Sequence, residues 1–177
     1  FFVILILIIG FDLFLWANIF CFRNNNSEIY FLDVGQGDSS LIILPENISI
    51  LVDAGPNSVV AQNLGSVSSY RKNYIDLAMI THPEIDHFGG FLDLLDRYNF
   101  GAFIINGKEA AQESQAIYNE LLQKIRSKNI PIVVLSEGDK ISYKNDSIEI
   151  ISPDENWIQS SETNQTALVF LLETEKF

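Results

Sequence analysis

The chain has 177 residues, of which 47% are hydrophobic and 19% are charged, and it carries 23 acidic against 11 basic side chains. This length suggests about one domain, and the apolar content excludes a disordered chain. The formal net charge of −12 argues against a general nucleic-acid surface, which depends on lysine and arginine. The single cysteine, Cys21, excludes a disulfide framework and a zinc site of the Cys-x-x-Cys type.

Residues 1–22 are almost wholly apolar, with Asp12 and Asn18 as their strongly polar side chains. A helix of this length rises about 33 Å, which is enough to cross the hydrocarbon core of a bilayer. The run lacks an amphipathic stripe and the features of a signal peptide. We therefore predict a transmembrane helix over residues 1–22. Asp12 is either a protonated side chain packed against sibling helices or a group that faces a water-filled path, and both predict a helix bundle.

Residues 23–27 read as a polar linker, and residues 28–177 as a domain in which short apolar runs alternate with helical patterns. Strands are predicted over 29–34, 40–44, 48–53, 75–81, 102–105, 132–135, 141–143, 148–151 and 166–172. Helices are predicted over 57–72, 91–98 and 110–128. Hairpins mixed with strand–helix alternation indicate an α/β sandwich built on mixed sheets.

Both histidines of the chain fall in one short segment, residues 81–90, directly after an apolar strand and before a helix. The potential ligands there are His82, Glu84, Asp86 and His87. Open α/β sheets place their functional sites at the carboxyl ends of strands, and imidazole with carboxylate suits Zn, Mn or Fe. The coincidence of strand, ligands, Gly89-Gly90 and helix favours a metal site over a polar loop with surface histidines.

The segment His82-x-Glu84-x-Asp86-His87 resembles the His-x-His-x-Asp-His signature of metallo-β-lactamase-fold hydrolases, with Glu84 at the second histidine. Four further segments point to a narrower group within these hydrolases: 31–39 (FLDVGQGDS), 51–55 (LVDAG), 81–83 (THP) and 164–169 (NQTALV). Together they resemble the C-terminal hydrolase domain of ComEC-type competence proteins, which are membrane proteins of bacterial DNA uptake. The likeness runs from Ile29 to Leu172 and implies an αββα sandwich, of which mainly the first half is present.

The resemblance also implies roles for individual residues. His82 and Glu84 would bind a first divalent metal ion, and Asp86 and His87 a second, with Asp86 as the catalytic residue. The two ions would be Zn or Mn, and the carboxylate of Glu84 favours harder ions such as Mn²⁺. Asp53 resembles a residue that orients a ligand histidine, although a turn before Gly55 explains it equally well. The remaining candidates that border the site, Asp33, Gln36, Asp38 and Asn164, are also explained as turn residues.

The function implied is that of a phosphodiesterase or nuclease acting on single-stranded or duplex DNA. Its partners would be the membrane, DNA and further transmembrane helices of the same protein. Its location would be the bacterial cytoplasmic membrane, with the domain on the extracytoplasmic side. The alternatives are a non-catalytic module that braces a DNA channel, and a hydrolase of the same fold acting on a lactone, thioester or lactam.

The ends of the chain carry a further expectation. The chain opens at Phe1 rather than at a methionine and has no third histidine, although the fold takes a bridging aspartate and two more histidines from its second half. We therefore expect a C-terminally truncated fragment that holds part of a metal site. We also expect the isolated chain to lack hydrolytic activity.

Overall fold

The structure is a computed structural model that describes residues 2–21, 26–67, 73–154, 156–160 and 162–175. Its helices are α1 (Phe2–Cys21), α2 (Val59–Ser66), α3 (Ile85–Phe88), α4 (Gly90–Leu94) and α5 (Gln115–Ser127). Its strands are β1 (Glu28–Phe31), β2 (Ser40–Leu44), β3 (Ile48–Val52), β4 (Tyr74–Ile80), β5 (Asn99–Ile105), β6 (Ile132–Val134), β7 (Lys140–Tyr143), β8 (Asp146–Ser152) and β9 (Val169–Glu173). Three 3₁₀ turns complete the elements: η1 (Pro45–Asn47), η2 (Trp157–Gln159) and η3 (Thr163–Thr166).

The strands form two sheets. The larger has the order β1-β2-β3-β4-β5-β6, antiparallel across β1, β2 and β3 and parallel from β3 to β6. The smaller is the antiparallel sheet β7-β8-β9. Parallel neighbours need crossover connections, which α2, α4 and α5 supply. The prediction of an α/β fold on mixed sheets is confirmed.

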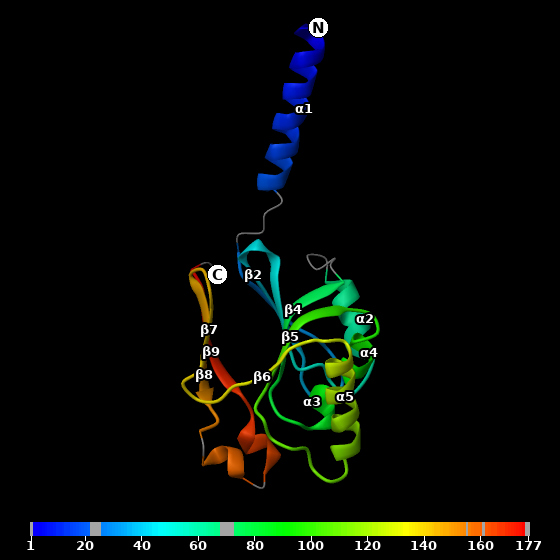
Figure 1. Cartoon of the computed structure of the whole chain (residues 1–177), viewed down its shortest axis with the longest axis vertical. Coiled ribbons are helices and arrows are strands. Elements are labelled where there is room, and N and C mark those ends of the chain that lie inside the picture. The colour runs from blue at the N-terminus through cyan, green and yellow to red at the C-terminus, as the bar shows by residue number, and fades with distance from the viewer. Residues whose placement is uncertain (1, 22–25, 68–72, 155, 161, 176–177) are drawn as a thin grey trace.

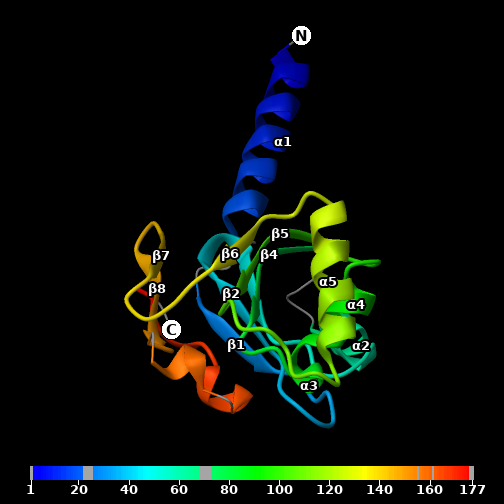
Figure 2. The ribbon, with the colours of Figure 1, turned by 60° about the horizontal axis from the view of Figure 1, so that its bottom comes forward.

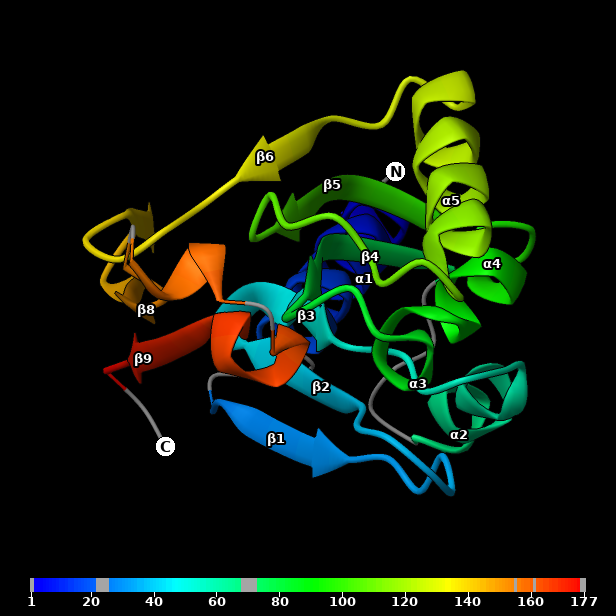
Figure 3. The same ribbon diagram turned by 90° about the horizontal axis from the view of Figure 1, so that it is seen from below.

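The two faces of the larger sheet are covered differently. Figure 3 shows α2, α4 and α5 on one face and the small sheet β7-β8-β9 on the other, and Figure 2 shows the same separation from another angle. The helix-covered face holds an aromatic cluster in which Phe91 and Phe103 meet edge to face, with ring centroids 5.2 Å apart. The face between the sheets packs aliphatic residues such as Ile50 and Ile150.

Helix α1 stands apart from the two sheets (Figure 1). Its side chains are described at position 4 and positions 6–16, and all of these are exposed. The predicted helix is confirmed over Phe2–Cys21. Over the part of the chain that the structure describes, no helix has both the length and the apolar character to cross a membrane. The predicted membrane span therefore has no support here.

Several predicted boundaries are wrong. The helix predicted over 91–98 ends at Leu94, because the amides of Asp96 and Arg97 bond to the carbonyls three residues before them and no longer four, which tightens the last turn. The helix predicted over 110–128 begins at Gln115. The strand predicted over 166–172 begins at Val169, because η3 occupies the residues before it. The helix predicted over 57–72 spans Val59–Ser66, and its residues 68–72 lie outside the described residues, as do residues 23–25 of the linker.

Candidate metal-binding site

The candidate site lies where the parallel strands β3 and β4 end. Asp53 follows β3, and Thr81 and His82 follow β4. A cavity of about 490 Å³ opens there, between the sheet edge and the η3–β9 segment. Its lining consists of Phe31, Asp38, Ser39, Ser40, Val52, Asp53, Thr81, His82, His87, Asn164, Ala167 and Leu168. This is the edge at which open α/β sheets bind ligands.

The backbone segments around the cavity are held close together by hydrogen bonds and by close packing. Asp53 adopts a left-handed conformation with φ 55°, which aspartate tolerates better than most side chains and which marks functional sites. The turn brings the Ala54 amide to the His87 carbonyl at 2.7 Å. Gly37 has φ 79° and approaches the segment so closely that a Cβ there would lie 1.8 Å from the Asp86 carbonyl oxygen. Only glycine fits this position, so the loop 35–38 is fixed against α3.

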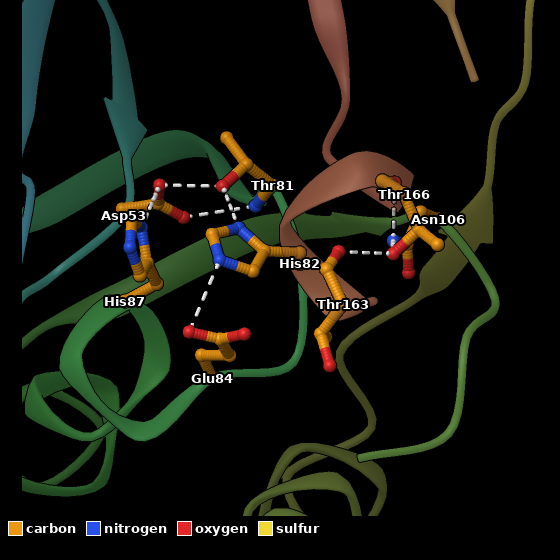
Figure 4. Close-up of polar contacts among 8 residues, drawn as sticks. All are labelled: Asp53, Thr81, His82, Glu84, His87, Asn106, Thr163 and Thr166. Atoms are coloured by element: carbon orange, nitrogen blue, oxygen red, sulfur yellow. Dashed lines mark hydrogen bonds and ion pairs between the residues drawn. The ribbon is translucent and has the colours of Figure 1, made fainter. Parts of the chain in front are cut away.

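The Asp53 carboxylate is the centre of the polar network (Figure 4). It is 2% exposed, and its Oδ1 accepts a hydrogen bond of 2.8 Å from the Thr81 amide. Its Oδ2 accepts from the Thr81 hydroxyl at 2.7 Å and faces His87 Nδ1 at 2.8 Å. A buried carboxylate needs hydrogen-bond donors of this kind, and Thr81 supplies two of them to Asp53.

The network also fixes which nitrogen of His82 carries the proton. His82 Nδ1 lies 3.0 Å from the Thr81 hydroxyl oxygen. Since that hydroxyl donates its proton to Asp53, it accepts the proton of His82 Nδ1. We infer the tautomer from this network. In the neutral ring the lone pair is then on Nε2.

His82 Nε2 is buried and has no partner in hydrogen-bonding geometry within the described residues. Glu84 Oε2 lies 3.7 Å from it. Desolvation and the neighbouring His87 lower the pKa of His82, against the opposing effects of Asp53, Glu84 and Asn164. His82 is therefore neutral at pH 7, the state in which imidazole binds a metal ion.

The pKa of His87 moves the other way. Burial alone would lower it, but the hydrogen bond and charge of Asp53, with the charges of Asp86 and Asp38, outweigh burial and raise it. The two rings are 4.0 Å apart between centroids. Because Asp53 holds Nδ1 of His87, the other ring nitrogen is left to face a ligand.

The side chains at this site are of the types that bind a metal ion, but fewer than three of those described are placed to hold one. A buried acceptor nitrogen without a partner, on a ring whose other nitrogen is held by a second residue, is the arrangement of a metal-binding histidine. However, the described residues contain no group of three or more His, Cys, Asp or Glu side chains placed to hold a metal ion. Among the described residues, the two histidines and Glu84 are therefore the donors that the geometry brings together.

The predicted site residues separate into three groups. His82, His87, Asp53, Asp38 and Asn164 line the cavity. Glu84 lies beside His82 but does not line the cavity.

The other three predicted residues, Asp86, Asp33 and Gln36, do not line the cavity. Asp86 lies in α3, and its backbone packs against Gly37. Residues 85–88 around it form this short helix, which the sequence analysis did not predict. Asp33 and Gln36 lie outside the cavity, and Asp33 Oδ1 accepts from the Gly35 amide at 3.2 Å, as the turn interpretation predicts. Gln36 is exposed.

Two residues of the site were not identified from the sequence. Thr81 links Asp53 to His82, and Asn106 lies at the end of β5, next to β4. Each is a polar residue directly after a buried strand. This signal marks Asp53 too, and it identifies both residues once the strand order is known.

Comparison with known proteins identifies the family. Residues 32–154 match the metallo-beta-lactamase superfamily. A comparison with curated protein sequences finds no match.

Solved structures share the fold at low identity. A metallo-beta-lactamase from Staphylococcus aureus subsp. aureus COL is 16% identical with a TM-score of 0.53, covering 86% of this chain and 40% of its own. MEM-A1, a subclass B3 metallo-beta-lactamase from a soil metagenome library, is 14% identical with a TM-score of 0.56 and covers 88% and 59%. Zn²⁺-bound PqqB from Methylobacterium extorquens is 13% identical with a TM-score of 0.54 and covers 78% and 50%. The chain therefore spans about half the length of these proteins.

Proposed function

The chain belongs to the metallo-beta-lactamase superfamily, and from this premise we propose that it is part of a metal-dependent hydrolase that cleaves phosphodiester bonds of DNA. The observation that carries the proposal is the orphaned Nε2 of His82, set beside His87 and Glu84 at a sheet edge. A buried acceptor of this kind costs free energy unless it serves a ligand.

The proposed roles follow the polar network. His82 and Glu84 would hold one ion, and Asp86 and His87 the other, with Asp53 and Thr81 orienting both rings. When bound, such ions supply an activated water and neutralise charge on a phosphate. The residues of this chain fix the tautomers and the ring orientations before any ion arrives.

The charge of the cavity supports a metal-dependent route for an anionic substrate. Its described lining contains Asp38 and Asp53 but neither lysine nor arginine. A phosphodiester entering this cavity meets like charge, so a cation has to compensate for it. Zn and Mn are the ions that we propose.

The test measures metal content and DNA cleavage together. The full-length protein should bind Mn or Zn in a fixed ratio and cut DNA when either is supplied, and His82→Ala should remove both properties. Asn119→Ala, on the exposed surface of α5, is the matched control and should keep both. Full metal occupancy and activity in His82→Ala would remove His82 from the ligand set.

We further propose that the whole protein is of the ComEC type and works in DNA uptake at the bacterial cytoplasmic membrane, with this domain on the extracytoplasmic side. The exposed apolar side chains of α1, such as Ile8 at 59% and Leu13 at 65%, support a membrane or apolar helices as its partner. The chain should float with phosphatidylethanolamine/phosphatidylglycerol vesicles. A variant with both Ile8→Lys and Leu13→Lys should float less. Equal flotation of both proteins would reject α1 as the membrane contact.

A second candidate function is a non-catalytic module that braces a DNA channel. The observation that favours it is the lack, in the described part of the chain, of a group of three metal-binding side chains. Metal-free full-length protein that still supports DNA uptake would decide for the brace and against the hydrolase.

A further inference from the structure

The segment formed by η3 and the start of β9 borders the cavity on the side of the small sheet. The buried side-chain amide of Asn106 attaches this segment to the large sheet. Asn106 follows β5 and is 4% exposed. Its Nδ2 donates to the Thr166 carbonyl at 2.7 Å and lies 3.3 Å from the Thr166 hydroxyl. Its Oδ1 accepts from the Lys108 amide at 2.9 Å. The whole amide is therefore used, as a buried polar group requires.

Further bonds hold the same segment in one conformation. Thr166 is fully buried, and its hydroxyl donates to the Thr163 carbonyl at 2.6 Å, which closes η3. The Leu168 amide donates to the Thr81 carbonyl at 2.9 Å, directly before His82. Lys108 Nζ donates to the carbonyls of Ile158 and Ser160 at 3.0 and 2.8 Å. The segment is thus attached to the ends of both β4 and β5.

The consequence of this attachment is the position of Asn164. It lies within η3, between Thr163 and Thr166, and lines the same cavity as the two histidines. It opposes the lowering of the His82 pKa by burial, but it does not reach hydrogen-bonding geometry with His82 Nε2. Figure 4 shows Asn106, Thr166 and Thr163 on one side of His82, with Asp53, Thr81 and His87 on the other.

Asn164 is also the one side-chain amide among the described residues that line the cavity. An amide NH₂ is a neutral donor that binds an anionic oxygen at fixed geometry. In a cavity lined by carboxylates, such a donor selects and orients a phosphate oxygen.

We propose that Asn106 is a positioning residue: through Thr166 it holds η3 in place and so keeps Asn164 in the lining of the cavity, where the Asn164 amide binds a non-bridging oxygen of a phosphodiester. The substrate part of this inference rests on the proposed function, whereas the attachment of η3 by Asn106 is independent of it. Neither part requires turnover by the chain.

The test uses the full chain in detergent micelles, with the dinucleotide dTpT as the phosphodiester probe. Asn106→Asp keeps the size of the side chain and the acceptor for Lys108, but removes the donor to Thr166. It should weaken dTpT binding about tenfold, the value of one hydrogen bond to a charged group. Asn164→Ala should weaken it equally, and the double variant should show no additional loss. Asn119→Asp adds the same charge on exposed α5 and should change nothing.

A second readout needs no substrate. The NMR resonances of the His82 ring at one fixed pH should move in Asn106→Asp and in Asn164→Ala, and stay in place in Asn119→Asp. Unmoved His82 resonances and unchanged dTpT affinity in Asn106→Asp would overturn the positioning role.

The remaining outcomes are also decisive. If circular dichroism shows Asn106→Asp unfolded, Asn164→Ala decides alone, since it truncates an exposed side chain, and an unchanged affinity there rejects the inference. Wild-type chain that binds no dTpT would remove Asn164 from substrate binding. DNA cleavage by the full-length protein tests the proposed function separately.

Discussion

The two faces of the large sheet differ in how much they bury. On the helix-covered face, 23 buried apolar residues form one cluster within the described part of the chain, whereas the cluster between the sheets has nine. The small sheet exposes Ile151, Val169 and Leu171 on its outer side. The candidate site lies where the two layers meet, with Asp53 and His87 on the side of the helices and Asn164 on the side of the small sheet. Stability and site assembly are thus expected to depend on different layers.

The sharpest test of this difference compares one substitution in both layers. Ile75 in β4 is fully buried in the helix-covered cluster, and Ile150 in β8 is 1% exposed in the other. We expect Ile75→Ala to lower the free energy of unfolding by about 4 kcal/mol and Ile150→Ala by about 2 kcal/mol, because the thinner layer collapses more easily around the lost volume. Urea unfolding of both variants measures the values. Equal losses would show that the layers contribute equally.

The next largest effect is expected from Asp53, which lies on the side of the site next to the helices. Asp53→Asn keeps the left-handed turn, which asparagine tolerates, but places an amide NH₂ against donors from Thr81 or His87. We expect a loss of about 2 kcal/mol in the free energy of unfolding and a lower pKa of His87.

The matched control is Asp76→Asn, where the carboxylate accepts two bonds of 2.8 Å from Ser49, away from the cavity. It should destabilise the fold and leave His87 unchanged. If both variants change the His87 pKa alike, Asp53 has no special role.

A smaller effect of opposite sign is expected inside the helix-covered cluster. Tyr118 is 2% exposed and its hydroxyl has no partner in hydrogen-bonding geometry within the described residues. Burial raises its pKa to about 12. Tyr118→Phe keeps the ring against Phe88 and removes the orphaned hydroxyl, so it should stabilise the protein by about 1 kcal/mol. A lower melting temperature in calorimetry would contradict this.

The smallest effect is the pH dependence of the two histidines. From the ordinary value of 6.5, burial and His87 lower the pKa of His82, while Asp53, Asp86 and Asp38 raise that of His87 against the effect of burial. The contribution of His82 to the free energy of unfolding therefore falls as the pH drops below 6.5. The contribution of His87 is lost as the pH rises through the pKa that it has in the folded protein. The two contributions together give a shallow maximum of stability near pH 6.5. NMR titration should show two midpoints on opposite sides of 6.5, and coincident midpoints would refute the network.

The sequence predicts the layers better than the contacts between them. Apolar runs located the strands, because burial on both faces requires them, and the spacing of His82 and His87 located the site. Asp53, at the end of a buried strand, was a candidate through its resemblance to a family residue that orients a ligand histidine. Thr81 and Asn106 carry the same signal, but their roles depend on β4 lying between β3 and β5, which local pattern does not contain. Asp86 was grouped with the ligands by spacing, and spacing does not show that it lies in α3, outside the lining of the cavity.

The shared carboxylate of Asp53 limits how this site can be altered. One side chain sets the proton position on both imidazoles, directly on His87 and through Thr81 on His82. The two rings are therefore interlocked, and no substitution at Asp53 retunes one of them alone. Variation that keeps both rings and changes only the surroundings of His82 can come from Glu84 or Asn164, neither of which bonds to Asp53. These two positions are where protein engineering of this edge should begin.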